Sequence, residues 1–312
     1  MPIRALMIIL QQETPSMSDI IKLLRPKDWA KNLFLFIPAF FAGKFFHIQD
    51  LELLIGGFFS FSFLASSIYI INDYRDIEDD KKHPVKCKRP LASGKVSPST
   101  ALLVAILLLV AGAGLGYFLD DSGKFLFILG IYYFLNLGYS FGLKNISILD
   151  IMIVAAGFVL RVKGGAVLGK IDTTSWLIIM TFLLALFMAT GKRRDDVLLK
   201  LSTGTDMRKV IKGYTIDYLN IVIGLLCAVM IVAYINYTVS GASYREFGHR
   251  LYYTAVFVIA GILRYLQIIF VQNNSGSPTD ILYKDRFIQL TLLLWIASFF
   301  VILYLKDLTV FE

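Results

Sequence analysis

The chain has 312 residues, of which 57% are hydrophobic and 14% are aromatic, and its mean hydropathy is +0.68. A domain of this length cannot hide so much apolar surface in a core, so the composition excludes a water-soluble globular protein. The net charge of +8 does not indicate nucleic acid as a partner, because the basic residues lie in short segments between apolar runs. The sequence therefore predicts a membrane protein.

Roughly nine segments approach the length of about 20 apolar residues that a helix needs to cross a bilayer. We predict one all-helical transmembrane domain over residues 1–312, with residues 1–20 as an N-terminal extension. The apolar stretch at 1–10 lacks a cleavage-like site of small residues, so we do not interpret it as a signal peptide. The predicted spans cover residues 29–43, 51–71, 99–119, 125–141, 149–169, 175–190, 210–239, 251–271 and 287–305.

The lysines and arginines are distributed unevenly about these spans. Most of them lie in the N-terminal segment and in the loops after the second, fourth, sixth and eighth spans. Basic loops stay on the cytoplasmic side, so we predict a cytoplasmic N-terminus and a multi-pass protein of the inner (cytoplasmic) membrane. The polar clusters then share the cytoplasmic face. Cys87 and Cys227 have neither the positions for a disulfide nor the spacing of metal ligands.

A short polar segment precedes the first predicted span. Pro26 suits the first turn of a helix, and Trp29 suits the membrane interface. Lys27 and Lys31 have two interpretations, as topology anchors or as cations that face a substrate. The sequence alone leaves both open.

The second predicted span ends in five acids within residues 72–80. If the helix continues, Asp73, Asp76 and Asp80 follow one another at spacings of three and four and project from one face, with Asn72 one turn before Asp76. Carboxylates stacked so closely repel one another unless a cation lies between them. Hard oxygen ligands suit Mg²⁺, which is usually shared between one or two carboxylates and the phosphates of a substrate. We predict that these four residues hold Mg²⁺.

A basic run follows the acids and suits phosphate oxygens, with Lys86 and Arg89 as its candidate substrate ligands. The pair at 83–84 is His-Pro, and the residue before a proline is disfavoured in a helix, so we expect the helix to end there. The following polar loop, residues 85–98, is long enough to fold over a site.

The fourth and fifth predicted spans carry polar residues with two interpretations each. Arg161 lies inside the fifth span, where a guanidinium costs about 2.5 to 3.5 kcal/mol on insertion scales, so it is a functional candidate. The alternative is an internal ion pair with Asp150 or Asp217. Tyr139 is a candidate for a hydrogen bond to a ribose hydroxyl, or a marker of the membrane interface.

The sixth and eighth predicted spans supply further cations. Lys192 and Arg193 lie at the end of the sixth span, at the depth where the acidic stretch begins, and Arg264 lies inside the eighth span. Before the last span, Asp285 and Arg286 either neutralise one another or contact a substrate.

These residues resemble the UbiA superfamily of intramembrane prenyltransferases. Its first motif, N-D-x-x-D-x-x-x-D, is matched in full by Asn72, Asp73, Asp76 and Asp80. The resemblance implies nine transmembrane helices around a central cavity, with a cytoplasmic cap over a Mg²⁺-diphosphate site. The aromatic prenyltransferases of the superfamily also have a second motif, usually D-x-x-x-D, after the sixth span. Here Gly191, Lys192 and Arg193 take its leading place.

Five patterns are instead similar to decaprenyl-phosphate phosphoribosyltransferases. They are R-P-x-x-W-x-K-N at 25–32, N-D-x-x-D-x-E-x-D-x-x-H-P-x-K-x-x-R-P at 72–90, G-K-R at 191–193, R-Y at 264–265 and P-T-x-x-x-x-x-D-R at 278–286. This resemblance implies Mg²⁺-dependent transfer of phosphoribose from phosphoribosyl pyrophosphate to a membrane polyprenyl phosphate. The alternatives are prenyl transfer from a polyprenyl diphosphate to an aromatic or quinone precursor, and a transporter in which Arg161, Arg264 and Asp217 line a path.

The implied chemistry assigns roles to the polar residues. Asp73, Asp76 and Asp80 would act in catalysis through the metal, which stabilises the leaving diphosphate. A phosphate monoester is already anionic, so the acceptor needs no general base. Arginine binds phosphate through two parallel hydrogen bonds and lysine as a point charge. The candidate substrate ligands are Lys31, Asn32, Lys86, Arg89, Tyr139, Arg161, Lys192, Arg193 and Arg264.

Overall fold

The computed structural model describes residues 16–82, 85–203, 209–241, 248–272 and 278–304. Its long helices are α4 (Ile48–Arg75), α6 (Pro98–Leu119), α7 (Lys124–Phe141), α8 (Leu149–Leu168), α9 (Ser175–Thr203), α10 (Ile216–Thr238), α12 (Ala255–Phe270) and α14 (Arg286–Tyr304). The short helices are α2 (Met17–Leu24), α3 (Ile37–Phe41), α5 (Ile77–Lys82) and α13 (Pro278–Lys284). The 3-10 segments are η1 (Pro26–Phe36), η2 (Lys86–Lys88), η3 (Leu143–Asn145), η4 (Lys209–Gly213) and η5 (Gly248–Thr254).

The described ranges contain helices and no strand, so the prediction of an all-helical membrane fold is confirmed. Among these residues, eight helical segments are long and apolar enough to cross a bilayer, one of them formed by part of η5 together with α12. Each overlaps one of the last eight predicted spans. The sixth span runs on past its predicted end at residue 190, because α9 continues to Thr203.

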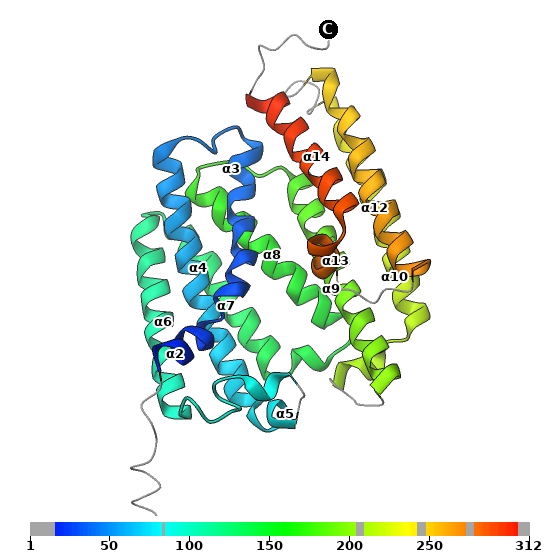
Figure 1. Ribbon diagram of the computed structural model, residues 1–312. Helices are drawn as coiled ribbons and strands as arrows, with labels where there is room; N and C mark the ends of the chain where they lie inside the picture. The colour runs from blue at the N-terminus through cyan, green and yellow to red at the C-terminus, as the bar shows by residue number, and fades with distance from the viewer. Residues whose placement is uncertain (1–15, 83–84, 204–208, 242–247, 273–277, 305–312) are drawn as a thin grey trace, which may run out of the picture.

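The first predicted span, 29–43, is not a regular α-helix. It consists of η1 and α3, with Pro26 at the start of the first and Pro38 within the second. This dark blue segment passes through the bundle beside α4 and α8 (Figure 1). The approach to α8 is very close: a Cβ at Gly165 would lie 1.8 Å from the carbonyl oxygen of Leu35. Only glycine fits there.

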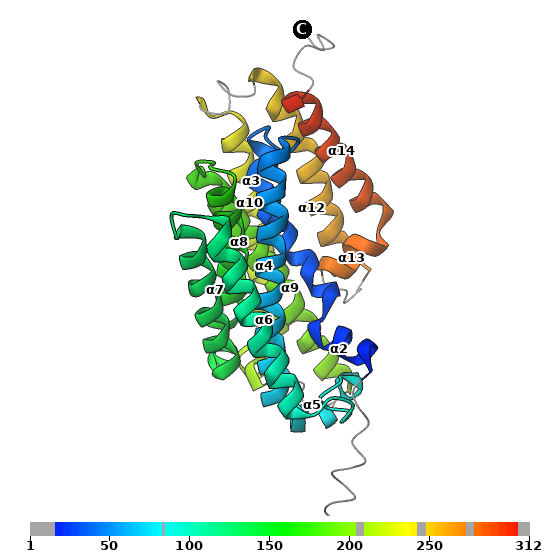
Figure 2. The same cartoon turned by 90° about the vertical axis from the view of Figure 1, so that its left-hand side faces the viewer.

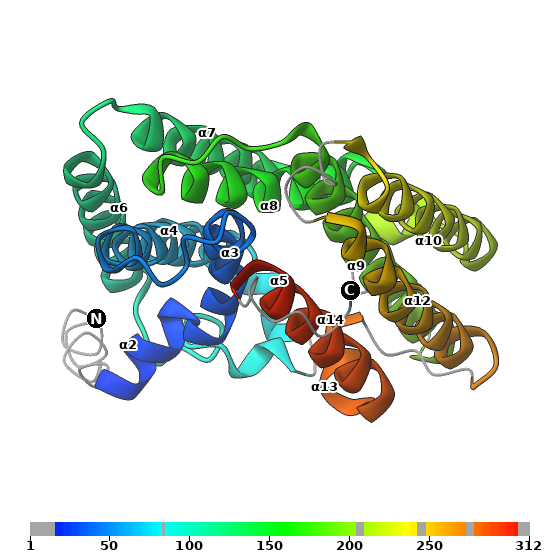
Figure 3. The same cartoon turned by 90° about the horizontal axis from the view of Figure 1, so that it is seen from above.

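The helices fall into two groups, which Figure 3 shows from above. In the first group α4 packs against α6, α7 and η1, around a core of apolar side chains that includes Phe61, Phe125 and Leu168. In the second group α9 packs against α10, and Phe187, Ile223 and other apolar residues form a separate core with α12. The contact between α8 and α9 joins the two groups.

The two groups also meet through aromatic side chains at the end of the bundle that lies away from α5 (Figures 1 and 2). Phe41 of α3 lies edge-on to Trp295 and Phe299 of α14, with ring centroids 6.2 and 5.1 Å apart. Phe46 makes a similar contact with Phe300 at 6.3 Å. This end of the bundle is therefore closed by ring packing.

The N-terminal helix α2 includes part of the predicted extension at 1–20, of which residues 1–15 lie outside the described residues. Ser16 caps the helix by accepting from the backbone N–H of Asp19, and Leu23 is buried in a small core with Ile70 and Val96. The last part of the extension is thus an element of the fold. It places the next residue, Arg25, beside the end of α4.

Candidate active site

The acidic stretch is divided between two helices. Helix α4 ends at Arg75, Asp76 is its C-terminal cap with φ −95° and ψ 10°, and α5 begins at Ile77. The prediction that all three motif carboxylates project from one helical face is therefore wrong. Asp73 and Asp80 are buried, each 3% exposed, and face one set of cations, whereas Asp76 faces another.

Asp73 and Asp80 share a guanidinium. Nη1 of Arg89 donates to Oδ1 of Asp73 at 2.9 Å and to Oδ2 of Asp80 at 2.7 Å. Nζ of Lys86 lies 3.9 Å from Oδ1 of Asp80. The segment after α5 thus covers the acids, as expected of the loop at 85–98, although residues 83–84, where a helix end was predicted, lie outside the described residues.

Arg25 is a residue of this site that the sequence analysis missed. Its Nη2 donates to both carboxylate oxygens of Asp73, at 2.7 Å to Oδ2, and its guanidinium lies over the ring of Tyr69 at 5.3 Å. The backbone of Arg25 is left-handed, with φ 54°, where the chain leaves α2 for η1. Nothing local marks the contact, because 48 residues separate the two partners.

Asn72 and Asp76 form the other half of the motif, with Lys144 of η3. Nζ of Lys144 donates to the two carboxylate oxygens of Asp76 at 2.8 and 2.7 Å, and to Oδ1 of Asn72 at 3.0 Å. Lys144 was not among the predicted substrate ligands. It is 68 residues from Asp76 in the sequence and carries no motif of its own.

The oxygen atoms of the motif could bind a magnesium ion in two pairs: Asp73 with Asp80, and Asn72 with Asp76. Within the described ranges, no group of three or more His, Cys, Asp or Glu residues is arranged to hold a metal ion. Each half of the motif does place two side chains around one cationic nitrogen, at hydrogen-bond distance and through oxygen atoms alone. Mg²⁺ usually takes only one or two carboxylates from the protein and completes its shell with water and phosphate oxygens. Either pair meets that requirement.

A second polar cluster joins α7, α8 and α9. Arg193, 4% exposed, donates from Nε to Asp150, from Nη1 to Asp196 at 2.7 Å and from Nη2 to the hydroxyl of Tyr139 at 3.3 Å. Tyr214 donates its hydroxyl hydrogen to Asp150 at 2.6 Å. Arg193 and Tyr139 were predicted to bind substrate. In the structure, their hydrogen bonds connect α7, α8 and α9.

Tyr214 completes this cluster from the segment before α10. Its hydroxyl oxygen accepts from the backbone N–H of Ile148 at 2.6 Å, where the chain has a left-handed φ of 70°. Burial, together with the hydrogen bond to Asp150, raises the pKa of Tyr214 above its usual value. The phenol therefore stays protonated and remains a donor to the carboxylate.

Arg161 is buried, 4% exposed, on the inner side of α8. Its Nε donates to Oδ1 of Asn32 at 2.6 Å, Nη2 to the hydroxyl of Tyr132 at 2.9 Å and Nη1 to the carbonyl of Gly157 at 2.8 Å. The alternative of an ion pair with Asp150 is wrong, because that carboxylate accepts from Arg193 and Tyr214.

The depth of Arg161 separates it from the acid motif. Arg161 is linked through Asn32 to Ser62, which lies 11 residues before Asp73 on α4, or about 16 Å along a helix axis. Asn32 bridges Arg161 to the hydroxyl of Ser62 on α4, to which its Nδ2 donates at 2.9 Å. The structure thus does not bring Asn32 and Arg161, two predicted substrate ligands, to the acids. It uses them to attach η1 to its neighbours.

The remaining predicted cations lie in three places. Lys31 bonds to Asp28 at 2.6 Å and lies 5.8 Å from the ring of Tyr69, the ring that Arg25 also covers. Lys192 is exposed at the site end of α9. Arg264 donates to Asp285 at 2.8 Å.

The partner of Arg264 is Asp285. Asp285 was expected either to neutralise Arg286 or to meet a substrate, and the structure pairs it with Arg264 of α12. This hydrogen bond lowers the pKa of Asp285 below its usual value. The pair connects α12 to the junction of α13 and α14.

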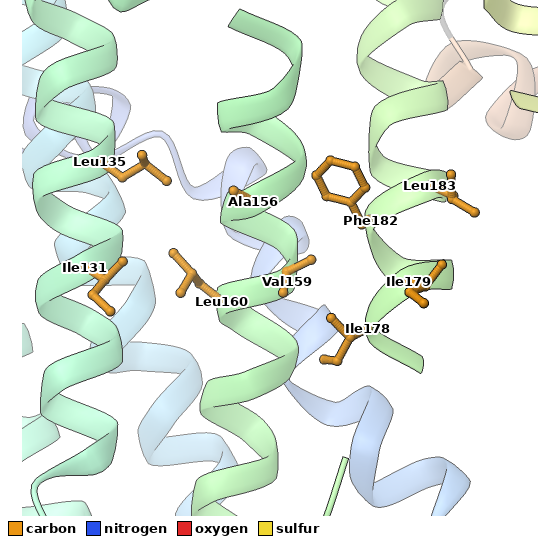
Figure 4. Close-up of a pocket in the computed structure, with 9 residues that line it drawn as sticks. All are labelled: Ile131, Leu135, Ala156, Val159, Leu160, Ile178, Ile179, Phe182 and Leu183. Atoms are coloured by element: carbon orange, nitrogen blue, oxygen red, sulfur yellow. The ribbon is translucent and has the colours of Figure 1, made fainter. Parts of the chain in front are cut away.

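An apolar hollow of about 400 Å³ lies between α7, α8 and α9, and Figure 4 shows the side chains around it. It carries no charged group and is separate from the acid motif. It is lined by Ile131, Leu135, Ala156, Val159, Leu160, Ile178, Ile179, Phe182 and Leu183.

The fold and the site define a class: a helical membrane protein with acids and built-in cations at one end of its bundle. The chain belongs to the UbiA prenyltransferase family, whose family model matches residues 33–291. It is 31% identical over 300 residues to the decaprenyl-phosphate phosphoribosyltransferase of Corynebacterium glutamicum, covering 95% of this chain and 90% of that one. It is 34% identical over 292 residues to the Mycolicibacterium smegmatis protein of the same name, covering 90% and 91%.

Solved structures show the same fold. A UbiA homolog from Archaeoglobus fulgidus bound to GPP and Mg²⁺ matches with a TM-score of 0.66 and 20% identity, over 91% of this chain and 99% of that one. A digeranylgeranylglyceryl phosphate synthase matches with a TM-score of 0.64 and 17% identity, over 92% and 98%. At these identities the likeness concerns the fold alone.

Proposed function

We propose that this protein transfers phosphoribose from phosphoribosyl pyrophosphate to a membrane polyprenyl phosphate and releases diphosphate. The observation that carries the proposal is the acid motif surrounded by four cations from three parts of the chain: Arg25, Lys86 with Arg89, and Lys144. Such a site suits a polyphosphate bound together with a metal ion. The relatives named decaprenyl-phosphate phosphoribosyltransferase, which match almost the whole chain, support this choice of reaction.

The acid motif receives the donor in this proposal. Mg²⁺ held by Asp73 and Asp80, or by Asn72 and Asp76, would neutralise charge on the leaving diphosphate as a Lewis acid. Arg89 already lies between two carboxylates, so its guanidinium is positioned to pass to a phosphate oxygen when a substrate enters. The three motif aspartates are the residues that we propose as catalytic.

The acceptor needs cations but no base. Its phosphate is anionic at neutral pH and attacks C1 of the ribose directly, so no side chain has to remove a proton. Lys31 and Arg25 lie beside the same ring of Tyr69 and bring positive charge from η1 to the acid motif. Lys192, exposed at the site end of α9, adds a further charge. We propose that these cations bring the two anionic substrates together.

The lipid acceptor would approach between η1 and α14. The two helix groups are joined by aromatic packing at the opposite end of the bundle, through Phe41 and Phe299. On the site side, Leu33 of η1 is 56% exposed, and Phe287 and Leu290 of α14 are 48% and 54% exposed. Apolar side chains on both sides suit a hydrocarbon tail, which would leave the phosphate beside Lys31.

We further propose that the acid motif faces the cytoplasm from the inner membrane, within a single catalytic domain over residues 1–312. The concentration of lysine and arginine in segments at the site end supports this orientation, because basic segments remain cytoplasmic. Phosphoribosyl pyrophosphate is water-soluble, so a cytoplasmic site would give it direct access.

The test is a transfer assay with the purified protein, Mg²⁺ and phosphoribosyl pyrophosphate labelled in the ribose. With a long polyprenyl phosphate as acceptor, we expect the label to become extractable into organic solvent and diphosphate to be released. A parallel reaction offers a prenyl diphosphate and an aromatic acid. Product in the second reaction and none in the first would replace this proposal with prenyl transfer.

A further inference from the structure

Lys144 occupies one half of the acid motif. Its Nζ has three hydrogen bonds of 2.7 to 3.0 Å, two to the carboxylate of Asp76 and one to the amide oxygen of Asn72. The amide nitrogen of Asn72 closes the group by donating to Asp76 at 3.1 Å. A cationic nitrogen therefore lies among three oxygen atoms of the two residues that form half of the predicted metal site.

The loop that carries Lys144 is fixed against α4. Gly142, with φ +145°, allows the chain to turn out of α7 into η3. Arg75 donates to the carbonyl of Ser140 at 2.5 Å and lies 4.3 Å from the centre of the ring of Phe141. The ammonium is thus held in place by the fold around it.

Lys144 and a divalent ion would compete for the same atoms. An ammonium donates hydrogen bonds to carboxylate and amide oxygens, and these hard oxygens are also the ligands that Mg²⁺ and Mn²⁺ prefer. Two cations cannot share the small space between Asn72 and Asp76 without strong repulsion. A metal ion that enters this half must displace the ammonium.

We propose that Lys144 is a built-in counter-ion for Asn72 and Asp76, so that a divalent ion binds the free protein weakly and loads together with a diphosphate. When the metal ion displaces the ammonium of Lys144 from Asp76, the oxygen atoms of a bound diphosphate can accept its hydrogen bonds. Metal and diphosphate then increase each other's affinity by the same factor. This inference rests on the proposed function, which makes a diphosphate the group that shares the site.

The coupling is measurable in the unmodified protein. Mn²⁺ binding to the full-length protein in detergent is followed by electron paramagnetic resonance, with and without inorganic pyrophosphate and after correction for Mn²⁺ bound to pyrophosphate in solution. We expect pyrophosphate to tighten Mn²⁺ binding by about tenfold or more, within the usual range of coupling between sites. Equal Mn²⁺ affinity in the two conditions would overturn the proposal without any variant.

The variant Lys144→Met tests the residue itself. Removal of the competing charge should tighten binding of Mn²⁺ alone by about tenfold and reduce the effect of pyrophosphate. Lys163→Met is the matched control, because Lys163 is exposed and its Nζ bonds only to Thr173 among the described contacts. Unchanged or weaker Mn²⁺ binding in Lys144→Met would overturn the proposal.

The two proposals fail separately. The Mn²⁺ experiment contains neither ribose nor lipid, so an absence of phosphoribosyl transfer would leave its result intact. Conversely, transfer activity with no coupling between Mn²⁺ and pyrophosphate would retain the proposed function and remove this role of Lys144.

Discussion

Asp150 has no exposed surface and accepts a hydrogen bond from Nε of Arg193 across the contact between α8 and α9. This contact joins the two groups of helices, and Tyr214 adds a second donor to the same carboxylate. A buried ion pair stabilises a fold only when its remaining hydrogen-bonding atoms are satisfied, and here they are satisfied from three further residues: Tyr139, Asp196 and Tyr214.

Removal of one partner of this pair should destabilise the fold. In Asp150→Ala the guanidinium of Arg193 loses its buried carboxylate, and such losses cost about 3 to 5 kcal/mol. The measurement is thermal unfolding in detergent, with Asp121→Ala in an exposed loop as the control. If Asp150→Ala melted at the wild-type temperature, the cluster would not be what joins the helices.

The acid motif should be needed for turnover in protein that remains folded. We expect Asp73→Ala and Asp76→Ala to lower the rate of transfer by at least about 100-fold, since even partners that only orient metal ligands cost 10- to 100-fold. Asp79→Ala is the control, because Asp79 lies between the motif residues on the exposed side of α5. Size-exclusion profiles establish that each variant is folded. If both motif variants turned over at the wild-type rate, the acids would have no catalytic role and would only form a solvated helix end.

The close approach of η1 to α8 predicts an effect of a single methyl group. Gly165→Ala would place a Cβ 1.8 Å from the backbone oxygen of Leu35, and neither backbone can move without disturbing its helix. Overpacking of this kind costs about 1 to 3 kcal/mol and occasionally more. Gly130→Ala provides the comparison, because a Cβ at Gly130 meets nothing within 4 Å. Equal melting temperatures for the two variants would refute the close packing.

The pair of Arg264 and Asp285 predicts a dependence of stability on pH. Arg264 lowers the pKa of Asp285, so the folded protein binds the proton less readily than the unfolded chain, in which the value is about 3.9. The stabilisation is complete above that unfolded value and is lost as the pH falls through the lower folded value. We expect Asp285→Asn to lack this part of the acid-induced loss when melting temperatures are compared from pH 6 downward. If the melting temperatures of the wild type and of Asp285→Asn fell in parallel with pH, the pair would not contribute this pH-dependent stabilisation.

The sequence predicted those features that depend on local pattern. The length of the apolar segments predicted the last eight spans. The spacing of Asn72, Asp73, Asp76 and Asp80 identified the acid motif. The irregular first crossing was not foreseen, because the apolar content of 29–43 does not distinguish an α-helix from η1 and α3.

The charge pairing could not be predicted, because it joins residues far apart in the chain. Arg25 meets Asp73 across 48 positions and Lys144 meets Asp76 across 68. Arg25 opens the pattern at 25–32, but that pattern does not name its partner, and Lys144 lies in no pattern. The partners of Arg161 and Arg193 could not be assigned for the same reason. Their partners come from other helices and become visible only when the bundle is assembled.

The central claim concerns which bond the protein forms, and the mass of the lipid product tests it most directly. Purified protein is incubated with Mg²⁺, phosphoribosyl pyrophosphate and a polyprenyl phosphate, and the organic phase is analysed by mass spectrometry. The account predicts a lipid that has gained one phosphoribosyl unit, and none in Asp73→Ala. Unchanged polyprenyl phosphate, in a preparation that prenylates an aromatic acid from a prenyl diphosphate, would contradict it.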